Sequence, residues 1–173
     1  MKKKNQTNIN QSVALFLIRL WLGVRVLISG IEKFSGTIAT DQPITIDGKK
    51  DVYGLTEAST TKAYGLEFYS GIPDSLKSKF SAEPLLPEWL LSPFNVILGP
   101  LLILLGITTL LGIFTRISLF VLGLVFTALT VGLVLIKQDA GVAWLGIHMI
   151  LIATVLFYSD RDHLVLWRKK EKV

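Results

Sequence analysis

The chain has 173 residues, of which 51% are apolar and 18% charged, and its mean hydropathy is +0.55. Several apolar stretches approach the roughly 20 residues that cross a bilayer, which excludes a soluble globular protein and indicates an integral membrane protein. The net charge of +5 comes mainly from lysines and arginines near the two ends of the chain, so we expect no nucleic-acid partner. The absence of cysteine excludes disulfides, thiol relays, thiolate-bound iron–sulfur clusters and covalently attached haem.

Residues 12–34 form the first apolar stretch. Lysines precede it as in a signal peptide, but the stretch is too long and no small-x-small cleavage site follows, so we predict an uncleaved transmembrane helix. It contains four charged residues, Arg19, Arg25, Glu32 and Lys33. Charges inside a bilayer are costly and persist where they face a protein interior, a partner or a wet cavity. The first helix is therefore the first place to look for function.

The charges of this helix fall into two groups. On a helical projection Arg19, Gly23 and Gly30 share one face, where the glycines let a second helix approach closely. Lys33 lies on the same face, and it and Arg19 are near opposite ends of the helix, so we expect both side chains to extend to the headgroups. Arg25 lies about 13 Å from the outer end of the helix, which is too deep for that.

Residues 35–92 form the long connection to the second helix. Turn-forming prolines and glycines alternate there with aromatic residues, a mixture too apolar for a disordered linker. We expect this segment to fold against the bundle, with short helices at residues 61–70 and 73–80 and an interfacial piece at residues 86–91. It serves either as a cap over the outer mouth of the bundle or as a docking face for a partner.

Three further apolar stretches follow, at residues 93–113, 116–136 and 141–158, and very short connections separate them. Such connections make consecutive helices antiparallel neighbours. The sequence therefore predicts an all-α fold: a single membrane domain over residues 1–173, built as an antiparallel bundle of four transmembrane helices with a long extracytoplasmic loop.

The basic residues predict the orientation of this bundle. The lysines before the first helix, Arg116 at the second turn and the basic C-terminal residues all fall on one side, which the positive-inside rule places in the cytoplasm. The connection over residues 35–92 has a net charge of −3 and falls on the outer side. Both termini are thus predicted to be cytoplasmic.

Arg25 has few candidate partners. Glu32 lies about 10 Å further along the same helix, and His148 of the fourth helix reaches a depth comparable to that of Arg25 if the helices are antiparallel. We predict a polar pocket open to the outside, built from Arg25, Glu32 and His148 with Asn95 as a fourth member. A buried histidine can instead serve only as a hydrogen-bonding group between helices. The chain has two histidines, and we predict no metal site.

Two short patterns resemble the DoxX family of small bacterial and archaeal membrane proteins. One is the arginine, glycine and glycine-x-x-lysine pattern of the first helix, and the other is a glycine-rich second helix that ends in a threonine-arginine turn. The residues that carry these patterns are Arg19, Gly23, Gly30 and Lys33, followed by Gly106, Gly112, Thr115 and Arg116.

This resemblance implies a subunit associated with redox systems of a bacterial or archaeal cytoplasmic membrane, in some members linked to quinone. The long outer segment is similar to that of the thiosulfate:quinone oxidoreductase DoxD branch. The second helix carries no acidic residue in its apolar part, which puts acid-dependent proton chemistry there in doubt.

Three functions stay open. The first is an accessory or structural subunit of a larger membrane redox complex, not catalytic by itself, which contacts the lipid bilayer and other membrane subunits. The second is a quinone-linked oxidoreductase subunit with a pocket around Arg25 and His148. A cysteine-free bundle needs such a bound quinone or a partner to move electrons, and we expect no other cofactor. The third is an assembly factor that shelters other transmembrane segments against the glycine face.

Overall fold

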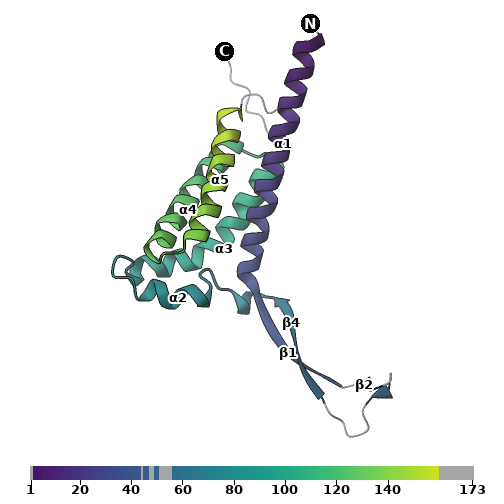
Figure 1. Ribbon diagram of the computed structural model, residues 1–173, viewed down its shortest axis with the longest axis vertical. Helices are drawn as coiled ribbons and strands as arrows, with labels where there is room; N and C mark the ends of the chain where they lie inside the picture. Colours follow the sequence, from purple (N-terminus) through teal and green to yellow (C-terminus); the bar gives the residue numbers. More distant parts are fainter. Residues whose placement is uncertain (1, 44, 47–48, 51–55, 160–173) are drawn as a thin grey trace.

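The computed structural model describes residues 2–43, 45–46, 49–50 and 56–159. Within them, four helices are long and apolar enough to cross a membrane: α1 (Lys2–Ile31), α3 (Glu88–Leu111), α4 (Thr115–Leu135) and α5 (Asp139–Phe157). Their positions confirm the four predicted stretches. Most helix ends lie within a few residues of the predicted ones, but α1 and α3 begin earlier than predicted. The start of α1 and the end of α5 lie at one end of the molecule, and the connection between α1 and α3 lies at the other (Figure 1).

Helices α1 and α3 pack with their backbones in contact. A Cβ atom on Gly106 would lie 2.6 Å from the amide nitrogen of Leu27, and one on Gly30 would lie 2.8 Å from that of Ile103. Gly23 meets α3 in the same way, so the predicted close approach along this glycine face is confirmed. Because α3 already covers the face, the face is not open to the transmembrane segment of a client protein.

The core lies between the four long helices. Its fully or nearly buried apolar side chains come from every one of them: Leu22, Val26, Leu98, Leu102, Leu105, Leu119, Leu122, Val125, Phe126, Ile152 and Val155. Tight turns hold the helices together at the inner end. Helix α3 ends at Gly112, whose φ of 70° only glycine adopts readily, and Arg116 Nε donates a hydrogen bond of 3.0 Å to Ser159 Oγ after α5.

The outer segment contains a β-hairpin that the sequence analysis did not predict. Strand β1 (Ser35–Pro43) pairs antiparallel with β4 (Thr56–Tyr64), and a second pair, β2 (Thr45–Ile46) with β3 (Lys49–Lys50), lies toward the tip. The ribbon projects away from the helices (Figure 1). The all-α prediction is therefore wrong for this segment, and so is the expectation that the whole of it folds against the bundle.

The predicted helix at residues 61–70 is also wrong. The chain continues in β4 as far as Tyr64 and then forms only a 3₁₀ turn, η2 (Leu66–Phe68). Threonines and other strand-forming residues on both sides of the turn favour the ribbon, and their pairing outweighs the local pattern on which the helix was based.

The second predicted short helix is confirmed as α2 (Asp74–Ser81), which lies across the outer ends of the long helices (Figure 1). The interfacial piece predicted at residues 86–91 is not separate, because α3 begins at Glu88 and absorbs most of it. Trp89 lies in the first turn of α3 with 76% of its side chain exposed, as an aromatic residue at a headgroup boundary would be.

Candidate ligand-binding cavity

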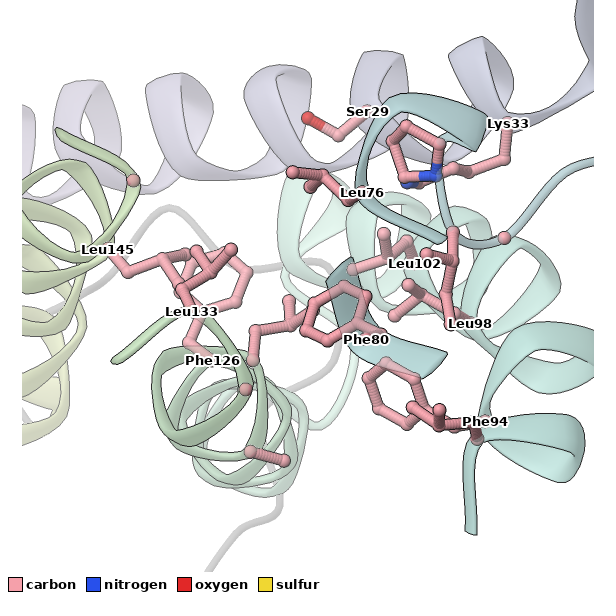
Figure 2. A pocket seen from close by; sticks show the side chains of 18 of the residues that line it. Ser29, Lys33, Leu76, Phe80, Phe94, Leu98, Leu102, Phe126, Leu133 and Leu145 are labelled. Atoms are coloured by element: carbon pink, nitrogen blue, oxygen red, sulfur yellow. The ribbon is translucent and has the colours of Figure 1, made fainter. Parts of the chain in front are cut away.

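A cavity of about 420 Å³ lies between the long helices beneath α2. Sites for small molecules commonly have such a volume and a mostly apolar wall. Most of the wall is apolar and comes from α2, α3 and α4, including Leu76, Phe80, Phe94, Leu98, Leu102, Phe126, Leu129 and Leu133. Figure 2 shows Phe80 of α2 between the α3 side chains Leu98 and Leu102 and the α4 side chain Phe126.

Helix α2 closes the outer end of the cavity. Ile72, Leu76 and Phe80 of this segment all belong to the wall. Phe80 reaches α4 beside Gly132, where a Cβ atom would lie 3.3 Å from the ring. The segment around α2 thus has the position of the predicted cap over the mouth of the bundle.

Asn95 ties this cap to α3 and does not line the cavity. Its side-chain oxygen accepts a hydrogen bond of 2.7 Å from the amide of Ile72. Gly71 lies against the Asn95 carbonyl so closely that no Cβ would fit there. The prediction that Asn95 belongs to the polar pocket is therefore wrong, because its amide is used at the seam between the cap and α3.

Tyr69 completes the same seam by filling a gap in the hydrogen bonding of α3. Proline has no amide hydrogen, so Pro100 leaves the carbonyl of Val96 without its partner in the helix. The Tyr69 hydroxyl lies 2.8 Å from this carbonyl and 2.6 Å from that of Asn95, and it accepts a hydrogen bond of 3.1 Å from the amide of Gly99. A Cβ atom at Gly99 would lie 2.5 Å from the Tyr69 ring, so glycine is required for this approach.

The polar residues of the cavity come from α1, from the turn that follows it and from α5. Arg25 and Ser29 line it from α1, Lys33 lines it from the 3₁₀ turn η1 (Glu32–Phe34) that continues this helix, and His148 lines it from α5. Ser29 and Lys33 lie on the α1 side in Figure 2, facing the apolar side chains of the other walls. The structure therefore brings together two of the four predicted pocket residues, Arg25 and His148, and adds Ser29 and Lys33.

His148 presents a buried hydrogen-bond acceptor at the cavity wall. Its side chain is 5% exposed, and Nδ1 lies 2.7 Å from the carbonyl oxygen of Trp144. Because a carbonyl can only accept, Nδ1 carries the proton, and Nε2 of the neutral ring is left with a free lone pair. Nε2 is buried and has no hydrogen-bond partner within the described part of the chain.

Arg25 lies at the rim of the cavity. Its side chain is exposed although it belongs to the wall, and the same holds for Trp144 of α5, which is 58% exposed. These two residues belong to α1 and α5, which contact each other in the bundle. The structure thus places the Arg25 side chain at an open edge, which corrects the expectation that bundle walls enclose it.

Two cations of this wall, Arg25 and Lys33, form no salt bridge with any carboxylate among the described residues. Glu32 is the nearest acid in the sequence, but it is held elsewhere. Its carboxylate accepts hydrogen bonds of 2.6 and 2.7 Å from Lys62 Nζ and one of 3.1 Å from the Tyr64 hydroxyl, at the base of the hairpin. The prediction that Glu32 lines the pocket is wrong.

Arg19 is a second correction on α1. It is 1% exposed, with its guanidinium 5.6 Å from the centre of the Phe16 ring, so it does not extend to the headgroups as expected. The other residues of the DoxX-like patterns lie in the α1–α3 contact or at the α3–α4 turn. Of that set only Lys33 lines the cavity.

No family model, curated protein or solved structure matches this chain. Within the described residues there is also no group of three histidine, aspartate or glutamate side chains placed to hold a metal ion. The sequence analysis missed Ser29 and the α2 residues of the wall. The spacing of Ser29, four residues after Arg25, is a signal that would have found it.

Proposed function

We propose that the protein is an accessory subunit of a membrane complex and that it holds an amphipathic ligand in the cavity beneath α2. The observation that carries this proposal is an apolar cavity of about 420 Å³ whose wall also contains Arg25, Lys33 and His148. Small-molecule sites combine such an apolar wall with a few polar groups that orient the ligand.

A purely structural bundle would fill such a space with side chains, because voids in a packed core are costly. Here the wall instead combines large apolar surfaces with a few polar groups, as ligand sites do. The DoxX resemblance implies that the ligand is a quinone or its reduced form. In that case Arg25 and His148, on the same wall, orient the head group.

The proposed setting is a bacterial or archaeal cytoplasmic membrane with both termini in the cytoplasm. In support, the α3–α4 turn carries Arg116, whereas the connection at the opposite end has a net charge of −3. The basic residues after residue 159, which contribute to the same prediction, lie outside the described part of the chain.

The experiment is extraction of the protein purified in mild detergent, followed by mass spectrometry of the extract. Gly132→Leu places a larger side chain in the wall beside Phe80, and Gly146→Leu is the matched control because nothing lies within 4 Å of that glycine. We expect an amphipathic compound in stoichiometric amount from the wild type and the control, and a large loss from Gly132→Leu. Equal recovery from both variants, or no compound from any sample, would contradict the proposal.

A second function, docking of a partner subunit, is favoured by the projecting hairpin. The ribbon of β1 and β4 has only two strands among the described residues, and such ribbons are marginally stable alone in water. Gly36 and Ala63 are register partners, so residues 37–62 can be replaced by a short turn between them. We expect this variant to lose a copurifying partner but to keep the cavity ligand; unchanged partner recovery would contradict a docking role of the ribbon.

A further inference from the structure

The polar groups of the cavity differ in kind from those that a neutral quinone needs. A quinone offers only carbonyl acceptors, and a neutral His148 with its proton on Nδ1 has no donor left for them. Arg25 and Lys33 add two positive charges to the wall, and neither has an acidic partner in the part of the chain that the structure describes. A negatively charged group on the ligand would therefore balance these two cations.

We infer that the cavity binds a single-chain anionic amphiphile, a long-chain carboxylate of the fatty-acid class. This inference rests on the proposed ligand-binding function and specifies its ligand. The carboxylate lies along Arg25 and Lys33, whose guanidinium and ammonium groups donate hydrogen bonds to it. The Ser29 hydroxyl between them donates to the carbonyl of Arg25.

The distribution of charge along the wall agrees with such a molecule. All four polar residues lie on α1, on the 3₁₀ turn η1 that follows it or on α5, whereas the walls from α2, α3 and α4 are apolar. An amphiphile can place its charged end against the polar wall and its apolar chain against the other walls.

The cavity volume of about 420 Å³ lies within the range of small-molecule sites. The charge of the head group also discriminates, since an uncharged head leaves both cations without a counter-charge.

The test measures binding of palmitate to the full chain in nanodiscs of phosphatidylcholine. One readout is the part of the tryptophan fluorescence that is lost in Trp144→Phe, and the other is native mass spectrometry. The methyl ester of palmitate has the same chain without the charge, and lysophosphatidylcholine is a single-chain zwitterion. We expect palmitate to bind at least about tenfold more tightly than either, since removal of one charge–charge contact of 1.4 kcal/mol is a factor of ten.

Variants of the protein test the same dependence on charge by removing the cations of the wall. We expect Lys33→Gln and Arg25→Gln each to weaken palmitate binding about tenfold and to leave the ester unchanged, whereas Lys62→Gln at the hairpin has no effect. Equal binding of acid and ester, or tighter binding of a quinone than of palmitate, would overturn the anionic assignment but leave a ligand-binding cavity. Absence of binding of every probe would overturn the proposed function itself. If the charge variants fail to fold, the comparison of acid and ester on the wild type still decides.

Discussion

At the scale of single residues, the hydroxyl of Tyr69 replaces a hydrogen bond that Pro100 cannot make. Tyr69→Phe removes this hydroxyl and leaves the Val96 carbonyl and the Gly99 amide without it. The Gly99 amide and the Asn95 carbonyl at this contact are partly buried, and a buried backbone group that is left unsatisfied costs about 1–3 kcal/mol. We expect Tyr69→Phe to lower the thermal unfolding temperature measured in detergent and to loosen the cap over the cavity.

Tyr64→Phe is the control for this prediction. The Tyr64 hydroxyl also makes a hydrogen bond, to Glu32, but the side chain is 54% exposed, so water replaces the lost contact. We expect little change in unfolding temperature from it. A Tyr69→Phe protein as stable as Tyr64→Phe would show that α3 tolerates the gap at Pro100 without help.

Gly106 provides a second prediction at this scale. A Cβ atom there would lie 2.6 Å from the backbone of α1, whereas one at Gly146 meets nothing within 4 Å. Gly106→Ala should separate α1 from α3 and destabilise the protein by about 1–3 kcal/mol, the usual cost of overpacking. Gly146→Ala should be neutral. Unfolding in a denaturing detergent compares the two, and equal stabilities would refute close packing of α1 on α3.

At the scale of elements, the four long helices follow from the sequence because their length and hydropathy leave no alternative in a bilayer. The hairpin cannot be predicted from the sequence in the same way. Its strands pair residues far apart in the chain, such as Ser35 with Tyr64, and no local pattern states which stretch will be the partner. The helix expected at residues 61–70 failed for this reason, whereas α2 has a local amphipathic pattern and was found.

The base of the hairpin is held by an ion pair whose dependence on pH has a definite sign. The hydrogen bond from Lys62 to Glu32 raises the pKa of the Lys62 ammonium above its ordinary value. The contribution of the pair is therefore complete below the ordinary lysine pKa of about 10.4 and is lost as the pH rises through the raised value. The pair is exposed, so the effect is modest.

A spin label on Cys at position 60 reports this change, since the chain has no other cysteine. We expect the label on β4 to become more mobile above about pH 10.4 in the wild type. The Glu32→Gln variant should already be mobile at neutral pH and should lack the step. A step of the same size in both proteins would mean that the ion pair does not hold the ribbon.

At the scale of the whole molecule, the sequence located part of the site through depth alone. Arg25 and His148 were expected at comparable depths on antiparallel helices, and both line the cavity. Glu32 and Asn95 satisfy the same depth argument and fail, because the hairpin and the cap supply partners for them that only the folded outer segment brings near. Depth is a property of one helix, whereas the choice of partner depends on the whole fold.

The arrangement of the helix ends predicts which positions share a side of the membrane. Ser59 on the hairpin and Lys137 at the α4–α5 turn should lie on one side, and Phe114 at the α3–α4 turn on the other. With single cysteines at these positions, an impermeant maleimide added to intact cells should label the first two nearly completely and Phe114→Cys only after lysis. Labelling of all three before lysis would contradict this topology.

The seam at Tyr69 and Asn95 imposes an order on biogenesis. Residues 69–72 leave the ribosome before α3, yet the carbonyls and the amide oxygen that they contact belong to α3. The contacts of residues 69–72 can therefore form only after α3 has been made and packed beside α1. Closure of the chamber beneath α2 is then a late event in folding.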